Sequence, residues 1–462
     1  MSELSNIFLE ESENKAFDKD HRKKILFNIA RYDQAVLQGK KQYQDLDLAR
    51  ERAAFIRHKV INELDKYLAE FEANFESHGG RVLWAQDEKE ALREIYRILR
   101  RHDAKLVVKS KSMTTEEVEL NDFLKKHKIE AVETDLGEFI VQTAGEKPYH
   151  IVTPAMHKSR EDVAELFNAR FGTPLDDPPE KITAYVRELL RDKFIRADAG
   201  ISGANFLIAD TGAVALTENE GNALMSVSFP RVHIVLAGID KVVPSVKDLD
   251  LLWPLLATHG TGQKLTVYNS LISGPRQEGE TDGPSEMYVI LLDNGRTNVL
   301  EETEQRRALS CIHCGACLNA CPVYRNIGGH TYQSAYSGPI GAIITPQMFG
   351  MKEYKHLSFA SSLCGKCTEV CPVKINLHEL LLYNRRDMVK SGYTKSSERF
   401  AMWTARKVFT RRRRMDYGGA RMRNYVLRKF FAKSWGPRRE LPQVPVKSFK
   451  QLWEEKRGIF PK

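Results

Sequence analysis

The sequence predicts a multidomain protein in which an α/β unit with a parallel sheet is followed by an all-helical unit. Three observations lead to this prediction. The 462 residues are many for one domain, strand-like and helical segments alternate through the middle of the chain, and all seven cysteines fall between positions 311 and 371. Hydrophobic residues make up 42% and charged residues 28% of the chain, which is typical of a globular protein with sizeable cores.

Residues 1–77 are predicted to form an N-terminal helical arm. Apolar residues recur at helical spacing from Ile56 to Phe75, and the pattern ends at Gly79. An amphipathic helix of this kind usually packs on its own domain, so we expect a structural role for the arm.

Residues 78–297 are predicted to form one α/β domain with an added set of strands. The alternating segments are typical of βαβ units, which bury a parallel sheet between helices. They are RVLWA and the helix after it, LVVKS, a helix capped by Thr114 and Glu117, EAVETD, GEFIVQTAG, HIVTP and the helix KITAYVRELLRDKFIR. RVHIVLAG, KLTVYNSLI and MYVILLDNGR are later strands, and FLIADTGAVALTENEGN is predicted to be a hairpin that turns at Asp210–Gly212.

Residues 298–400 are predicted to be helical and carry the cysteines, and residues 401–462 form a basic C-terminal region. Between Thr404 and Glu440 there are 13 Lys or Arg and 2 Asp or Glu, a local charge of +11, whereas the whole chain has a charge of +9. The body of the protein is therefore nearly neutral. The Pro-rich stretch WGPRRELPQVPVKSF is expected to be extended.

The sequence favours a cytoplasmic location. No apolar run is long enough to cross a membrane, and the first residues, MSELSNIFLEESENK, lack the apolar core of a secretory signal. An odd number of cysteines packed into one short window is typical of metal ligands in a reducing compartment, whereas disulfides are spread over the fold.

The first cysteine motif is C-x2-C-x2-C-x3-C-P, formed by Cys311, Cys314, Cys317, Cys321 and Pro322. This is the ligand pattern of bacterial two-cluster ferredoxins, in which the fourth cysteine binds the other cluster. Three thiolates on a tight loop can reach three corners of one cubane, and soft sulfur donors suit iron–sulfur clusters. The motif therefore predicts two clusters of the [4Fe-4S] type.

The second motif, Cys364, Cys367 and Cys371 before Pro372, is one ligand short, and Ser361 stands where a further cysteine would be expected. The crossover rule gives two ligand sets, namely Cys311, Cys314, Cys317 and Cys371 for cluster 1, and Cys321, Cys364 and Cys367 for cluster 2. The fourth corner of cluster 2 is left open between Ser361, water, a residue of a partner protein, and a three-iron [3Fe-4S] cluster.

A zinc site is the alternative, because structural zinc also uses C-x2-C pairs. The spacing of the first motif is not usual for zinc, so the iron–sulfur interpretation is favoured. The 43 positions from Cys321 to Cys364 leave room for helices, and LHELLLYNRRDMV is helical. This arrangement matches the all-helical ferredoxin domains of multi-subunit dehydrogenases and reductases.

The segments CIHCGACLNACPVYRNIGGHTYQSAYSGPIGAI and SSLCGKCTEVCPVKINLHEL resemble the lactate utilization protein B family, the iron–sulfur subunit of bacterial L-lactate utilization systems. ADTGAVALTENEGN, FPRVHIVLAGIDKVV and GPSEMYVILLDNGR are similar to its lactate-utilization domain. The resemblance implies a Rossmann-like α/β domain, of the group that includes CoA-transferase and isomerase folds, followed by a two-cluster ferredoxin domain. It also implies a role in oxidising L-lactate to pyruvate, and so in growth on lactate, alongside two partner proteins.

We therefore expect an electron-transfer protein. No catalytic residue is assigned, and whether the chain is itself an enzyme is left open, although a non-catalytic component of an L-lactate-oxidising complex is favoured. One alternative is an electron-transfer subunit of another dehydrogenase or heterodisulfide-reductase-like complex, which normally has companions other than this α/β domain. A nucleic-acid enzyme with a structural cluster is a second alternative. The neutral body weighs against it, and no nucleic-acid partner is expected.

Several residues are weaker candidates for ligand sites. His150, His157 and His233 lie in or beside expected strands, and a structural role is the favoured interpretation for each. His259–Thr266 resembles a phosphate-binding loop but lacks the Walker spacing. Lys109–Lys111 follows a strand at the end where open α/β sheets bind ligands, and is a candidate anion pocket.

The basic tail has three interpretations. It is a solvated helical face, a docking surface for an acidic partner subunit, or an anchor to an anionic membrane surface through RNYVLRKFFAKSW, which mixes Lys and Arg with Phe and Trp. Docking to an acidic partner is favoured.

Overall fold

The computed structural model describes residues 2–412, 414, 417–435 and 440–459. The chain divides into two compact units, Met1–Ser391 and Gly392–Lys462. The first unit contains the N-terminal helices, the α/β domain and the cysteine-bearing region.

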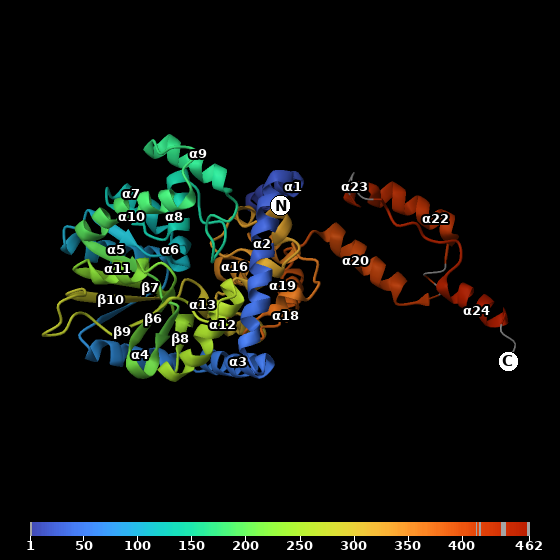
Figure 1. Ribbon diagram of the computed structural model, residues 1–462. Helices are drawn as coiled ribbons and strands as arrows, with labels where there is room; N and C mark the ends of the chain where they lie inside the picture. The colour runs from blue at the N-terminus through green and yellow to red at the C-terminus, as the bar shows by residue number, and fades with distance from the viewer. Residues whose placement is uncertain (1, 413, 415–416, 436–439, 460–462) are drawn as a thin grey trace. The chain divides into compact units, whose positions relative to one another are not determined.

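The centre of the first unit is a six-stranded parallel sheet with the strand order β1-β10-β7-β4-β2-β3. Its strands are β1 Arg81–Ala85, β2 Leu106–Lys109, β3 Glu130–Glu133, β4 Ala199–Ser202, β7 Val232–Gly238 and β10 Glu286–Leu292. Its strands β7 and β10 lie side by side (Figure 1). Strand β7 is buried along its whole length, as expected for a parallel sheet that is covered on both faces.

Alternate side chains of β7 face two separate cores. One core contains apolar residues of α5 (Glu88–Arg101) and α7 (Leu120–Lys126), and the other contains apolar residues of α4 (Leu64–Ser77). A third core packs β2 and β3 against α8 Leu136–Ala144, α9 Arg160–Phe171 and α10 Pro179–Arg196. The short helix α11 (Asn222–Ser228) lies next to β4.

A second sheet, with the order β8-β5-β6-β9, contains the predicted hairpin and part of KLTVYNSLI, whereas RVHIVLAG and MYVILLDNGR form β7 and β10 of the parallel sheet. Its strands are β5 Phe206–Ile208, β6 Ala213–Glu218, β8 Val242–Val243 and β9 Tyr268–Ile272. The predicted hairpin is confirmed, because β5 and β6 are antiparallel and the turn between them ends at Gly212 with φ +60. A Cβ atom at Gly212 would lie 2.3 Å from the backbone N of Phe75, so only glycine allows this turn to pack on α4.

The predicted N-terminal helices are present as α1 Glu3–Phe17, α2 Lys19–Gly39, α3 Leu46–Asn62 and α4. Helix α2 packs against α12 (Leu249–Thr261), and backbone meets backbone at this contact. A Cβ atom at Gly262 would lie 2.3 Å from the carbonyl carbon of Ala35, and one at Gly39 would lie 2.4 Å from Gly262 O. The close approach therefore depends on both glycines.

The cysteine-bearing region is helical, as predicted. Its α-helices are α13 Arg296–Glu301, α14 Ala316–Ala320, α15 Tyr324–Ile327, α16 Gly338–Phe349, α17 Lys355–Phe359, α18 Lys366–Val370 and α19 Leu377–Lys390. Arg296, just after β10, donates hydrogen bonds to Asp240 after β7, to Glu117 after β2 and to Tyr336 of this region. The region therefore covers the carboxyl-terminal edge of the parallel sheet, where open α/β sheets bind ligands.

Two local predictions are wrong. The segment HIVTP forms bends and turns, because the ring of its first residue, His150, accepts hydrogen bonds from the backbone N–H groups two and three residues further on. Thr114 and Glu117 do not cap α6 (Met113–Glu117), whose N-cap is Ser112. Both errors concern hydrogen bonds within three residues, which His150 accepts in its own loop and Ser112 accepts from Thr115 N.

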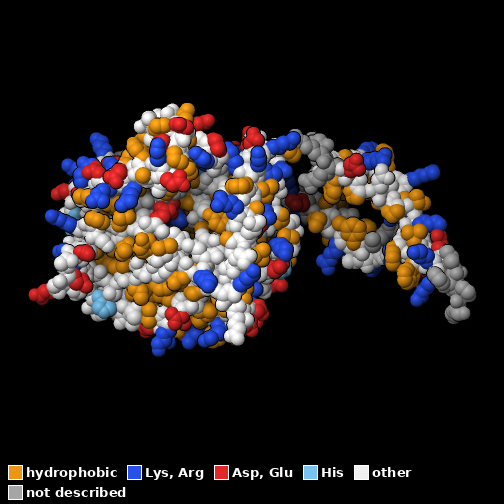
Figure 2. Space-filling view, viewed as in Figure 1, with side chains coloured by type: hydrophobic (Ala, Val, Ile, Leu, Met, Phe, Trp, Pro, Cys, Tyr) orange, Lys and Arg blue, Asp and Glu red, His pale blue; other side chains and the backbone are white. Residues whose placement is uncertain are grey.

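The second unit contains α20 Ser396–Phe409, α22 Gly419–Val426, a π-helical turn at Leu427–Phe431, α23 Ala432–Trp435 and α24 Phe449–Ile459. Of the stretch expected to be extended, residues 440–447 have no helix or strand and bend at 446–447, and residues 436–439 lie outside the described residues. Large apolar side chains such as Phe400, Trp403 and Tyr425 are exposed on these helices among Lys and Arg side chains (Figure 2). None of the described helices combines the length and apolar content that a membrane span requires.

Candidate iron–sulfur centre

The two cysteine motifs fold in the same way. In the first motif, Gly315 (φ +78) precedes the short helix α14, and Cys321 ends that helix. In the second motif, Gly365 (φ +80) precedes α18, and Cys371 ends it. Each glycine turns the chain sharply after the preceding cysteine, in a backbone conformation that other residues adopt only with strain.

This equivalence extends to the position that lacks a cysteine. In the first motif, the backbone N–H of His313 donates to Cys311 Sγ at 3.3 Å. In the second motif, the backbone N–H of Leu363 donates to Ser361 Oγ at 3.1 Å. His313 and Leu363 also share a positive φ, of 56° and 54°. Ser361 therefore stands where the first motif has Cys311.

The structure brings Cys371 of the second motif to the first motif. Burial, and then the charges of Cys311, Cys314 and Cys371, raise the pKa of the Cys317 thiol. Burial and then Cys371 also raise the pKa of the Cys311 thiol to about 12. These four thiols are therefore electrostatic neighbours, although 54 positions separate Cys317 from Cys371.

Cys321 joins the other set. Burial, and then the charge of Cys321, raise the pKa of the Cys367 thiol to about 11, with a further contribution from Cys364. Cys364 is exposed, whereas Cys321 and Cys367 are buried. The second set therefore lies nearer the surface than the first, which is buried except for the partly exposed Cys311.

The donor set fits iron–sulfur clusters better than single metal ions. Tetrahedral zinc with bonds of about 2.3 Å holds its sulfur ligands ~3.8 Å apart. In the part of the chain that the structure describes, one group of three or more His, Cys, Asp or Glu side chains has ligand atoms that all lie within 4.8 Å of one another. That group contains no cysteine, so the described thiols do not meet at the spacing of a zinc site. The zinc alternative is therefore disfavoured. Because burial raises the thiol pKa values, bound iron would supply the positive charge that keeps the thiolates ionised.

Cationic side chains surround the first set of cysteines. Arg57 of α3 is fully buried and donates to the carbonyls of the two residues before Cys311, at 3.1 and 3.3 Å. Arg50 of the same helix donates to Cys371 O at 2.8 and 3.1 Å. Burial lowers the pKa of Lys241, which also interacts with Cys311, to about 8. These charges would compensate the negative charge of a thiolate-bound cluster, and no local sequence signal identifies them.

The α/β domain packs directly on the first motif. A Cβ atom at Gly315 would lie 3.1 Å from His150 Cε1. Burial lowers the pKa of His150 to about 3, so its ring is neutral and holds its own loop against the motif. Burial alone would raise the pKa of the Asp240 carboxyl, but Arg296 and His313 hold it below its usual range.

The candidate anion pocket at Lys109–Lys111 is wrong. Lys109 is fully buried, and its ammonium lies 2.7 Å from Glu133 and 3.1 Å from Glu116. Lys111 forms an ion pair with Asp135 at 3.3 Å. Carboxylates of the protein therefore neutralise both lysines already.

His259–Thr266 is not a phosphate-binding loop. Its first three residues form the last turn of α12, and a helix C-terminus presents carbonyl oxygens that repel anions. His259 Nδ1 lies 2.9 Å from Leu255 O within the same helix. His233 is fully buried in β7 with its Nε2 2.9 Å from Ser202 Oγ, which is the structural role expected of it.

Comparison with known proteins agrees with this geometry. Residues 68–292 match the family model of the LUD domain, and residues 307–375 match that of the 4Fe-4S dicluster domain. The fold and the cysteine site thus define a protein in which a LUD domain is followed by a 4Fe-4S domain.

The curated relatives identify the family. The chain is 46% identical to lactate utilization protein B of Bacillus velezensis over 355 residues, which cover 76% of this chain and 74% of the relative. It is 46% identical to lactate utilization protein B of Bacillus subtilis over 349 residues, or 75% and 73% of the two chains. The chain belongs to the lactate utilization protein B family. A solved DUF162 family protein from Deinococcus radiodurans aligns with a TM-score of 0.29 and 14% identity, over 50% of this chain and 98% of that chain.

Proposed function

We propose that this chain is a two-cluster electron-transfer protein that takes part in the oxidation of L-lactate to pyruvate. The observation that carries the proposal is the pair of equivalent cysteine motifs, whose helices α14 and α18 pack together. The name of the relatives, lactate utilization protein B, supports the pathway. When bound, the clusters supply one-electron transfer.

The ligand assignment follows the crossover rule. Cluster 1 is bound by Cys311, Cys314, Cys317 and Cys371, and cluster 2 by Cys321, Cys364 and Cys367. The two sets of mutually interacting thiols support this division. Ser361 is the fourth ligand of cluster 2, because its oxygen accepts the same backbone hydrogen bond as the Cys311 sulfur. Water, a partner's residue and a three-iron cluster are the competing outcomes.

The different exposure of the two sets suggests a direction for electron exchange. Cys364 is exposed, so the cluster 2 side contacts redox partners, whereas the cluster 1 side is enclosed by the arm and the α/β domain.

The remaining parts of the proposal concern the α/β domain, the location and the partners. The α/β domain is Rossmann-like, and the protein works in the cytoplasm with two partner proteins of the lactate-utilization system. The basic tail contacts an acidic partner or an anionic membrane surface.

Iron analysis and EPR test the cluster assignment. Anaerobically purified protein is expected to contain about seven to eight irons per chain, and four or fewer would exclude two clusters. Cys371→Ser is expected to damage the cluster of the first motif, and a change confined to the other cluster would contradict crossover. Ser361→Ala is expected to convert cluster 2 to a three-iron form with its own EPR signal, and Ser361→Cys to retain four irons. Ser362→Ala, at the exposed neighbouring serine, is the matched control.

Growth tests the pathway separately. Deletion of the gene is expected to abolish growth on L-lactate and to leave growth on pyruvate unchanged. Normal growth on lactate would favour the other candidate, an electron-transfer subunit of a different dehydrogenase or heterodisulfide-reductase-like complex.

A further inference from the structure

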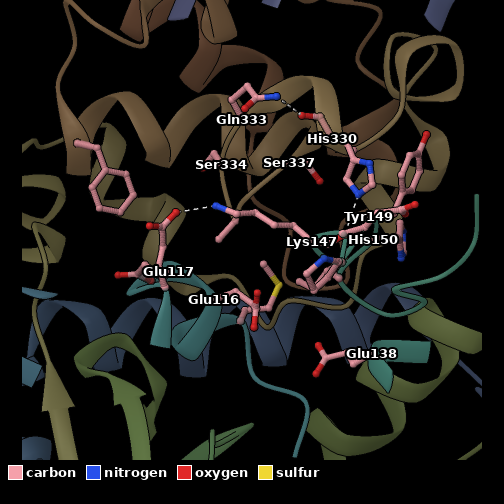
Figure 3. A pocket seen from close by; sticks show the side chains of 18 of the residues that line it. Glu116, Glu117, Glu138, Lys147, Tyr149, His150, His330, Gln333, Ser334 and Ser337 are labelled. Atoms are coloured by element: carbon pink, nitrogen blue, oxygen red, sulfur yellow. Dashed lines mark hydrogen bonds and ion pairs between the residues drawn. The ribbon is translucent and has the colours of Figure 1, made fainter. Parts of the chain in front are cut away.

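A cavity of about 490 Å³ lies between the α/β domain and the cysteine-bearing region. Figure 3 shows Glu116 and Glu138 on one side of it and Gln333 and Ser334 on the opposite side. A cavity of this volume can hold a small ligand. The cysteine ligands lie outside its lining, so electron transfer by itself does not explain it.

Three metal-ligating side chains from separate segments meet at this cavity. Glu146 follows α8, His157 lies in the loop before α9, and His330 begins the 3-10 turn His330–Tyr332 of the cysteine-bearing region. One ligand atom of each lies within 4.8 Å of the other two. Glu146 and His330 also line the cavity.

A hydrogen bond fixes the tautomer of His330. His330 Nε2 lies 2.7 Å from Lys147 O, so this nitrogen carries the proton and Nδ1 keeps its lone pair. A backbone carbonyl that accepts from the second ring nitrogen is typical of metal-binding histidines.

An ion pair explains only part of this arrangement. The Glu146 carboxylate lies 2.6 Å from His157 Nε2 and 2.7 Å from Lys158 Nζ. This contact does not require His330, whose ring centroid lies 5.0 Å from that of His157. It also leaves the buried Nδ1 of His157 without a hydrogen-bond partner among the described residues. A ligand shared by the three side chains would account for the position of His330 beside this pair.

We propose that Glu146, His157 and His330 bind one divalent transition-metal ion at the edge of the cavity. Two histidines and one carboxylate form a typical site for such ions and leave coordination positions open. The open positions face the cavity, because Glu146 and His330 line it. The ion joins the α/β domain to the cysteine-bearing region and brings positive charge to a wall that is rich in carboxylates.

Metal binding to the full-length protein, purified anaerobically with its clusters, tests the proposal. Mn²⁺ is the first probe, because imidazole and carboxylate bind it whereas thiolates prefer softer metals. Loss of the free Mn²⁺ EPR signal during a titration measures the bound ion. One Mn²⁺ per chain is expected, and Zn²⁺ is expected to displace it because Zn²⁺ binds such ligands more tightly.

Variants identify the ligands. His157→Ala and His330→Ala are each expected to weaken metal binding about tenfold or more, whereas His78→Ala, at an exposed histidine between α4 and β1, leaves it unchanged. Lys158→Met removes the competing ammonium from Glu146 and is expected to strengthen binding, which a purely structural ion pair would not do. Cluster absorption confirms that each variant is folded. The proposal would be overturned if wild-type protein bound neither Mn²⁺ nor Zn²⁺, or if the His157→Ala and His330→Ala proteins bound both ions as tightly as wild type. Either result counts against the metal site whatever the outcome of the lactate experiments.

Discussion

Replacing Arg296 by methionine tests how the α/β domain is joined to the cysteine-bearing region. Arg296 is only 3% exposed. Its guanidinium donates to both carboxylate oxygens of Glu117, at 2.9 and 2.7 Å, and its Nε donates to Asp240 at 2.7 Å. It also donates to the hydroxyl of Tyr336 at 3.1 Å. Methionine retains much of the volume but leaves the buried Glu117 without its counter-charge and removes one of the cationic partners of Asp240.

The expected loss of stability follows from the burial of these charges. Removing one partner of a buried ion pair costs about 3–5 kcal/mol, because the remaining charge stays buried and unpaired. The first unit, Met1–Ser391, has an unfolding entropy of about 0.8 kcal/mol/K at its size. Dividing the free energy by this entropy gives a lowering of the unfolding midpoint of about 4–6 °C.

Anaerobic differential scanning calorimetry of wild-type and variant protein measures this shift. Arg97→Met is the matched control, because Arg97 is exposed and pairs with Glu94 on the surface of α5, and it is expected to shift the midpoint by less than about 1 °C. The double variant with Glu117→Gln is expected to recover part of the loss, since the unpaired charge of Glu117 is then removed. An Arg296→Met midpoint within about 1 °C of wild type would refute the reasoning, because the network would then contribute no more than a surface pair.

Two further predictions concern packing and pH. Gly262→Ala places a Cβ atom 2.3 Å from the Ala35 backbone at φ +79, and thermal unfolding is expected to show a loss of about 2 kcal/mol or more in the free energy of unfolding. Gly145→Ala is the control, because Gly145 has φ +71 but open space around it, and this variant should lose about half as much. Equal losses would show that α2 can move away from α12. Burial lowers the pKa of His21 to about 4 and that of His233 to about 3, below the ordinary value of 6.5. The unfolded chain therefore binds more protons below pH 6.5, and the unfolding midpoint should fall as the pH is lowered from 7 to 5. His233→Gln should make this slope shallower, and an unchanged slope would mean that His233 is protonated in the folded protein.

Much of the architecture could be predicted from local patterns. The apolar runs of β7 and β10 and the helical periodicity of α5 and α10 are present in short windows, and the structure contains these elements as predicted. The errors fall where a side chain has a distant or unexpected partner. Lys109 has the position of an anion-binding residue, but Glu133 on the neighbouring strand neutralises it, and strand neighbours cannot be read from one strand.

The cysteine motifs could be identified from the sequence alone, because cluster ligands lie at characteristic spacings on tight loops. The spacing of the second motif already points to Ser361 as the position of the missing cysteine. The tertiary structure adds that a positive φ and a backbone hydrogen bond recur at both positions. It alone brought Arg57 of the arm to the carbonyls before Cys311 and His330 to Glu146 and His157. These groups are distant in the chain, and their meeting follows from how the domains pack, a property that no local pattern of residues contains.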